Sequence, residues 1–339
     1  MDHLRIIRRA FDITRVYRAL WVFGILIALA TSRGGGGNGG GGQMRGDSEA
    51  WNDLFRGRFP NMPQIPPDVA NAMIAGGIAL LCVALLIGVA LAVLRYVSLT
   101  AAIRMVDSYE STGERVTVRQ GFRLGWTRSA FRLWLVDLLF TLVGILVVIL
   151  LLLLAAAPLL LWLTQNETVG VIGTVVTIGA AFLVILLLVI AAALIGLWLQ
   201  VVYRAVVLEG LGVFDGIRRG WEIVRRRPGD VLIMGLILFG IGLAFTILML
   251  PFGLLLAVVA GVTGGLPGLL AGAIASIFAQ GQVPIFIGVL IGLPIFLAVL
   301  IIPLTFISGL FEVFTSSTWT LTFRELLALE TVRSEPEAV

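Results

Sequence analysis

Hydrophobic positions in this chain form long uninterrupted runs. Five runs exceed the roughly 18 residues that indicate a membrane-spanning helix. They cover residues 69–94, 133–163, 169–199, 231–262 and 283–311, and a shorter run covers residues 19–31. The pattern predicts an all-α integral membrane protein with about six transmembrane helices.

The composition supports a membrane protein and excludes several kinds of functional site. Hydrophobic residues make up 59% of the chain and charged residues only 13%, whereas about a quarter of a soluble protein is charged. All 24 basic residues are arginines, which excludes a Walker A phosphate loop and Schiff-base chemistry on lysine. Cys82 is the single cysteine, which excludes a disulfide within the chain and a cysteine-based metal site. We expect no cofactor and no bound metal.

The distribution of arginines predicts the orientation in the membrane. Residues 1–18 carry five, residues 95–132 seven, residues 204–227 six and the C-terminal tail two, whereas the segment 31–68 carries four and the turns near 164–168 and 263–282 carry none. By the positive-inside rule, both termini and the two long basic segments lie in the cytoplasm. The sequence thus predicts a multi-pass protein of the bacterial cytoplasmic (inner) membrane.

The N-terminus allows two interpretations. The stretch "RRAFDI", followed by a short apolar run and "ALA" at 28–30, is typical of a cleaved signal peptide. The alternation of Leu4, Ile7 and Phe11 with arginines instead favours a helix that is retained on the membrane surface. In the external segment 32–68, "GGGGNGGGG" predicts a flexible tether.

One hexapeptide occurs twice, as "GFRLGW" at 121–126 and "GIRRGW" at 216–221. Both copies lie in a basic segment before a long apolar run, and the spacing predicts an amphipathic helix in the plane of the membrane interface. Glycines four apart allow another helix to approach closely, tryptophan prefers the headgroup layer, and arginine binds anionic headgroups. The motif residues are Gly121, Arg123, Gly125, Trp126, Gly216, Arg218, Gly220, Trp221 and Arg225.

The recurrence predicts three repeated hairpin units with cytoplasmic interfacial helices. The first unit, 1–94, has a surface helix (1–18), a crossing (19–31), the external loop (32–68) and a crossing (69–94). The second, 95–199, has a cytoplasmic segment (95–132) and crossings at 133–163 and 169–199. The third, 200–312, has a cytoplasmic segment (200–230), a crossing (231–262), an external segment (264–282) and a crossing (283–311). Residues 313–339 form a cytoplasmic tail.

The stretch "VVLEGLGVFDGIRRGWEIVRRRPGDVLIMGLIL" resembles bacterial polytopic membrane proteins related to the membrane domain of the glycerophosphoryl diester phosphodiesterase family. The resemblance covers mainly residues 90–250 and rests on Glu209, Gly216, Arg218, Trp221 and Arg225. In that family the catalytic barrel is a separate soluble domain that carries histidines and acidic metal ligands. Because His3 is the only histidine here and no soluble stretch is long enough for a barrel, the resemblance implies the membrane part without the hydrolase.

Ionisable residues near the apolar runs are few. Asp137 and Glu312 lie close to the cytoplasmic ends of their runs, and Glu209 precedes the second hexapeptide. We expect them to form ion pairs with arginines such as Arg128, Arg132 and Arg324 or, alternatively, to form a gate. Since no ionisable residue lies at the centre of a run, the sequence argues against an ion-coupled pump and an intramembrane protease.

The last third of the chain is rich in proline and glycine. Pro251 and Pro294 interrupt apolar runs, and residues 264–282 are too short to span a bilayer, which predicts a re-entrant or interfacial segment. Broken helices can expose backbone groups to a substrate, so a permease or export component is one alternative.

The leading functional hypothesis is a non-enzymatic membrane protein that organises or senses lipid or scaffolds partners. Its expected partners are anionic headgroups on the cytoplasmic side, with a homo-oligomer or another membrane protein as a further possibility and no nucleic acid. A lipid-modifying enzyme is the weakest class, because no nucleophile, base and metal set is recognisable.

Overall fold

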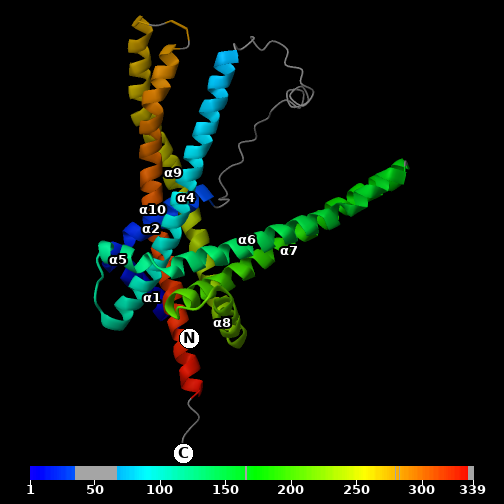
Figure 1. The fold of residues 1–339 in the computed structure, drawn as a ribbon, viewed down its shortest axis with the longest axis vertical. Helices are drawn as coiled ribbons and strands as arrows, with labels where there is room; N and C mark the ends of the chain where they lie inside the picture. The colour runs from blue at the N-terminus through cyan, green and yellow to red at the C-terminus, as the bar shows by residue number, and fades with distance from the viewer. Residues whose placement is uncertain (35–66, 165, 279, 282, 335–339) are drawn as a thin grey trace, which may run out of the picture. The chain divides into compact units, whose positions relative to one another are not determined.

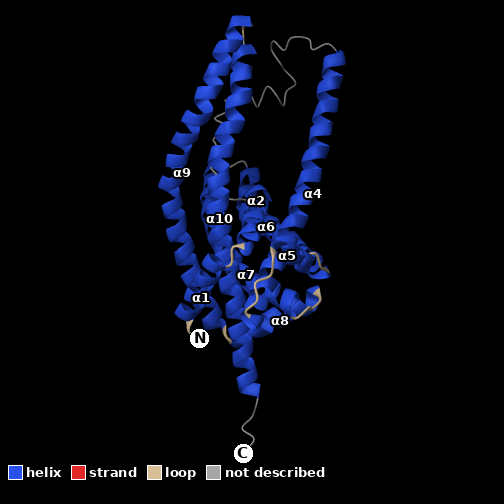
Figure 2. Cartoon of the chain, turned by 90° about the vertical axis from the view of Figure 1, so that its left-hand side faces the viewer, coloured by secondary structure: helices blue, strands red, loops and turns tan. Residues whose placement is uncertain are grey.

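A computed structural model describes residues 1–34, 67–164, 166–278, 280–281 and 283–334. Throughout this part the regular secondary structure is helical, as the apolar runs predicted (Figures 1 and 2). The helices are α1 (His3–Val16), α2 (Ala19–Gly34), α4 (Pro67–Thr112), α5 (Val118–Gly125), α6 (Arg128–Ala156), the 3₁₀ helix η1 (Ala157–Thr164), α7 (Glu167–Leu208), α8 (Val213–Arg226), α9 (Pro228–Phe278) and α10 (Val283–Ser334).

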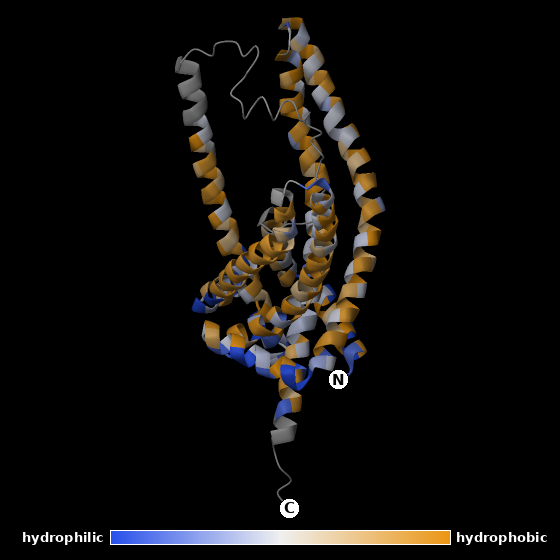
Figure 3. Ribbon diagram, turned by 90° about the vertical axis from the view of Figure 1, so that its right-hand side faces the viewer, coloured by the Kyte–Doolittle hydropathy of each residue, from blue (hydrophilic) through white to orange (hydrophobic). Residues whose placement is uncertain are grey.

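Five of the described helices are long and apolar enough to cross a membrane. They lie at Gly76–Thr112, Arg128–Leu161, Glu167–Leu208, Pro228–Phe278 and Val283–Glu330. Helices α1 and α2 would make a sixth if they form one span, although they meet at an angle of 99°. In Figure 3 the long helices are coloured hydrophobic over most of their length.

The chain divides into two compact units. One unit contains Met1–Ala28 together with Tyr96–Val339, and the other contains Leu29–Arg95. The second unit includes the whole external loop expected at 32–68, of which residues 35–66 lie outside the described part of the chain.

Buried side chains in the first unit gather where the basic segments meet. The core contains Phe23, Met105, Met234 and Phe323 from four helices and Tyr17 from the turn between α1 and α2, each at most 2% exposed. Large apolar side chains farther along the long helices, such as Leu146, Ile178 and Leu254, are more than half exposed. This distribution is typical of a membrane protein, because lipid tails can cover apolar side chains that water cannot.

The helices of the third hairpin extend beyond its apolar runs. Helix α9 continues from Pro228 to Phe278 through Pro251 and Pro267, so most of the segment expected at 264–282 is helical and continuous with the crossing before it. Helix α10 continues to Ser334, so the first part of the tail expected at 313–339 is also helical, and its residues Val313, Trp319 and Phe323 are buried in the core. The prolines are tolerated because α9 and α10 pack along each other, and each helix supports the other where a proline removes a backbone hydrogen bond.

Glycines bring α9 and α10 into backbone contact. A Cβ added at Gly268 would lie 2.8 Å from the carbonyl oxygen of Gly288, and one added at Gly292 would lie 2.7 Å from that of Gly264. Close approach of this kind gains packing energy between membrane helices and explains why the glycine-rich stretch remains helical.

We expect Gly268→Ala to destabilise the protein by about 1–3 kcal/mol, because the added methyl group meets a carbonyl that cannot move independently. Gly265→Ala is the matched control, since a Cβ at Gly265 has open space within 4 Å. It should leave stability unchanged or raise it by up to about 1 kcal/mol through helix propensity. Thermal unfolding of the two variants in detergent checks this, and equal shifts in Tm would contradict it.

Candidate functional site

The two hexapeptides form the short helices α5 and α8. Helix α5 begins at a capping box. The backbone N–H of Gln120 donates to Thr117 Oγ1, and the backbone N–H of Thr117 donates to Gln120 Oε1. Helix α8 begins after Gly212 and ends before Arg227. Both therefore start at a residue with extended backbone, which turns the chain from the preceding long helix into a new direction.

The motif glycines face the preceding long helix. A Cβ at Gly121 would lie 2.6 Å from Met105 Sδ of α4, and Gly125 lies against Val97 of the same helix. A Cβ at Gly220 would lie 2.6 Å from Val202 Cγ2 of α7. Gly216 lies in the same way against Val206 of α7, so neither helix has room for a larger residue at these positions.

The motif arginines and tryptophans face away from that contact. Trp126 is 72% exposed and Trp221 is 52% exposed, with the Trp221 ring edge-on to Trp198 of α7 at 5.6 Å. Arg123 and Arg225 are exposed, and the Arg218 side chain is 82% exposed. The sequence-predicted residues thus divide into a buried glycine face and an exposed arginine and tryptophan face.

Carboxylates surround the arginines of α8. Arg218 Nε lies 3.2 Å from Glu222, and Arg219 Nη2 lies 2.7 Å from Glu330 at the C-terminal end of α10. Glu209, which follows α7, lies 3.3 Å from Arg219. Desolvation lowers the pKa of Arg219, but Glu209 and Glu330 outweigh it, so the pKa is raised above its usual value.

The arginines around α5 are exposed and have a different environment. Within the described chain, no carboxylate lies within 4.0 Å of Arg115, Arg119, Arg123 or Arg128. The two acidic side chains near the end of α4 are used elsewhere: Glu110 pairs with Arg9 of α1 at 2.7 Å, and Asp107 pairs with Arg324 of α10.

Asp137 accepts hydrogen bonds from two tyrosines. Tyr96 Oη of α4 donates to it at 2.7 Å, and Tyr203 Oη of α7 donates to its other oxygen. Arg132, one of its expected partners, instead donates to the carbonyl of Gly210 at 2.7 Å. The expected pairing with Arg132 is wrong because residues five apart on a helix point about 140° away from each other.

Arg204 is a buried arginine that the sequence pattern did not single out as a site residue. It is 1% exposed on α7, and its guanidinium donates to the carbonyls of Gln200 at 2.9 Å and of Ser316, in α10, at 3.3 Å. Glu312 of α10 acts on it electrostatically. Arg204 lies on the part of α7 that continues to Leu208, within the segment expected to be cytoplasmic from residue 200 onward. The signal was present as a single arginine inside the apolar stretch "VVYRAVVL".

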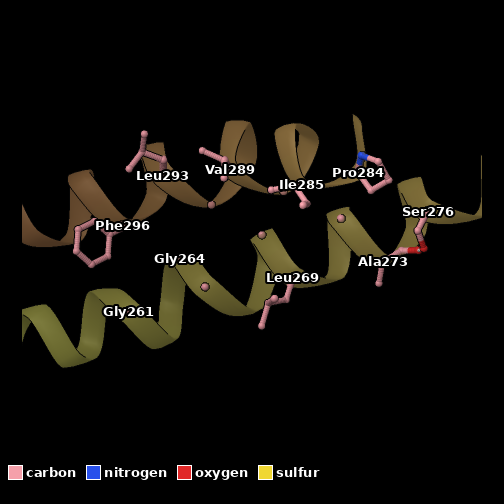
Figure 4. Close-up of a pocket in the computed structure, with 15 residues that line it drawn as sticks. Gly261, Gly264, Leu269, Ala273, Ser276, Pro284, Ile285, Val289, Leu293 and Phe296 are labelled. Carbon is pink, nitrogen blue, oxygen red and sulfur yellow. The ribbon is translucent and has the colours of Figure 1, made fainter. Parts of the chain in front are cut away.

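The groove between α9 and α10 is lined by few polar side chains. Its volume is about 650 Å³, and it is lined by glycines and apolar side chains (Figure 4). Ser276 is the polar side chain among its lining residues, and its hydroxyl donates to the carbonyl of Ala273 at 2.7 Å. Among the residues that the structure describes, no three His, Cys, Asp or Glu side chains are grouped closely enough to hold a metal ion.

Comparisons with known proteins give one match. The model of a family described as "Family of unknown function (DUF7544)" matches residues 3–323. No curated protein and no solved structure matches the chain.

We expect Arg204→Gln to lower the free energy of unfolding by about 1.5–3 kcal/mol, because it removes the charge-assisted hydrogen bonds that the guanidinium donates to the carbonyls of Gln200 and Ser316. Arg123→Gln, at an exposed position, should change stability by less than about 0.5 kcal/mol. Thermal unfolding in detergent compares them, and a Tm for Arg204→Gln equal to that of the wild-type chain would refute the structural role of this side chain.

Proposed function

Since the chain belongs to the DUF7544 family of unknown function, we propose its function from its own surface. It is a non-enzymatic multi-pass protein of the bacterial cytoplasmic membrane, and those arginines of its interfacial helices that pair with no carboxylate of the described chain hold anionic lipid headgroups of the inner leaflet. Through these contacts it organises or senses the lipid around its long apolar helices.

The observation that carries this proposal is the shared arrangement of α5 and α8. The pattern V-x-x-G-[F/I]-R-x-G-W gives the same burial at each matched position. Both glycines are buried, Phe122 and Ile217 are half-buried, and the following arginine and the terminal tryptophan are exposed. Two helices that fix their backbones by glycine and turn arginine and tryptophan outward have the distribution expected of a surface that meets headgroups.

Helix α1 supports a third copy of the same arrangement. Its buried small residues Ala10 and Thr14 are four apart, and the helix packs on α10, as α5 packs on α4 and α8 packs on α7. Three surface helices, each lying on the end of a long helix, agree with three repeated units and with α1 being retained as part of the folded chain.

The chemistry of the exposed face suits phosphate. A guanidinium donates two parallel hydrogen bonds to phosphate oxygens, and an arginine near an anionic leaflet contributes about 1 kcal/mol of binding. Exposed Trp126 and Phe214 place aromatic rings beside the arginines, at the level of the headgroups.

The resemblance to the membrane domain of the glycerophosphoryl diester phosphodiesterase family remains a proposal of the same kind. It agrees with a membrane-embedded role that has no hydrolase activity. The permease alternative rested on broken helices in the third hairpin, and we do not pursue it because α9 and α10 are continuous through their prolines.

We expect the purified full-length chain to retain phosphatidylglycerol in preference to phosphatidylcholine when both are supplied equally in mixed micelles. Native mass spectrometry counts the bound lipids. Because the attraction is electrostatic and screened by salt, the preference should fall as ionic strength rises. Equal retention of the two lipids at low salt would remove the proposal.

A further inference from the structure

We infer that the two matched helices have different partners: α5 binds anionic lipid, whereas the arginines of α8 are occupied by carboxylates of the same chain and fasten the end of α10. This inference rests on the proposed function and assigns the lipid site within it.

Ion pairs account for most of the charge on α8. Four of the five arginines between residues 218 and 227 lie within 4.0 Å of a carboxylate. Glu330 alone receives two of them, at 2.7 Å from Arg219 and 3.3 Å from Arg226. These contacts join α8 to a residue more than one hundred positions further along the chain, so they hold the C-terminal part of α10 in place.

Around α5, by contrast, the arginines have no carboxylate partners within the described chain. Arg119 and Arg123 lie one turn apart on the face turned away from Gly121 and Gly125. Arg115 and Arg128 extend this charge at the two ends of the helix. Within the described chain none of the four has a carboxylate within 4.0 Å; residues 115–128 contain no acidic residue, and Glu114 directly precedes them.

The acidic residues that could neutralise α5 face other helices. Glu110 is held by Arg9, and Asp107 is held by Arg324, so both carboxylates at the end of α4 are already paired. Just after the end of α7, by contrast, the carboxylate of Glu209 pairs with Arg219 of α8. The matched glycine packing therefore presents a free basic face in α5 and a compensated one in α8.

Binding of lipid phosphate has different requirements at the two helices. At α5 the phosphate replaces only water around the guanidinium groups. At the paired arginines of α8 it must displace Glu222 or Glu330 from an existing charge-assisted pair, and the gain from the new contact is offset by the loss of the old one; Arg225 is the one arginine of α8 without such a pair in the described chain. The tryptophan of α5 is also the more exposed of the two. Trp126 is 72% exposed, whereas Trp221 is 52% exposed because its ring packs on Trp198.

The test uses the full-length protein in detergent with phosphatidylglycerol as the probe and phosphatidylcholine as the reference lipid. Arg119→Gln with Arg123→Gln removes two exposed arginines from α5. Arg218→Gln with Arg226→Gln removes two exposed arginines from α8, with side chains 82% and 65% exposed, and is the matched control. We expect the α5 variant to bind phosphatidylglycerol roughly 30-fold more weakly and the α8 variant to change by less than about twofold.

A second variant tests the inference through a gain of lipid binding, which a misfolded protein would not show. Glu222→Gln with Glu330→Gln frees the α8 arginines and should raise phosphatidylglycerol binding several-fold, and adding Arg218→Gln and Arg226→Gln should remove that gain. Weakening by the α8 variant equal to that by the α5 variant, or no gain from the glutamine variant with its Tm within a few degrees of wild type, overturns the inference alone. A wild-type chain without preference for phosphatidylglycerol overturns the proposed function and this inference together.

Discussion

The glycine contacts between short surface helices and long apolar helices determine how this protein presents its charge. Gly121 and Gly125 allow α5 to lie on α4, and Gly216 and Gly220 allow α8 to lie on α7. Each glycine reduces helix propensity by about 1 kcal/mol relative to alanine, so the close contact must repay that cost. Once the glycine face is fixed, helical geometry turns the arginines of the same motif outward.

Arginines also connect the ends of the long helices to one another. Arg104 of α4 donates to the carbonyl of Leu124 in α5 at 3.1 Å, Arg204 of α7 donates to Ser316 of α10, and Arg324 of α10 donates to Asp107 of α4. The guanidinium group suits this role because it has five donors and stays charged. The core at the basic end of the chain is therefore held by charge-assisted hydrogen bonds to backbone carbonyls as well as by apolar packing.

Three buried threonines of α10 satisfy their hydroxyl groups within the helix itself. Thr318, Thr320 and Thr322 are fully buried, and each hydroxyl donates to the carbonyl four residues earlier at 2.8 Å. The stretch "FTSSTWTLTF" can therefore enter the interior without requiring partners from other helices for these hydroxyls. This is why α10 continues as a helix beyond its apolar run.

Several features of the protein follow from its sequence alone. Long apolar runs can satisfy their backbone groups in lipid only as helices, so the all-α membrane class is determined locally. The spacing of "GFRLGW" and "GIRRGW" likewise predicts which residues share a helix face. Tertiary structure decided the rest, because the partner of a charge depends on which helices meet. Asp137 accepts from Tyr96 and Tyr203, Arg204 is buried against Ser316, and Glu330 reaches Arg219 from 111 positions away. The proline-containing runs of α9 and α10 continue as helices because glycines on both bring their backbones together, a support that no local pattern contains.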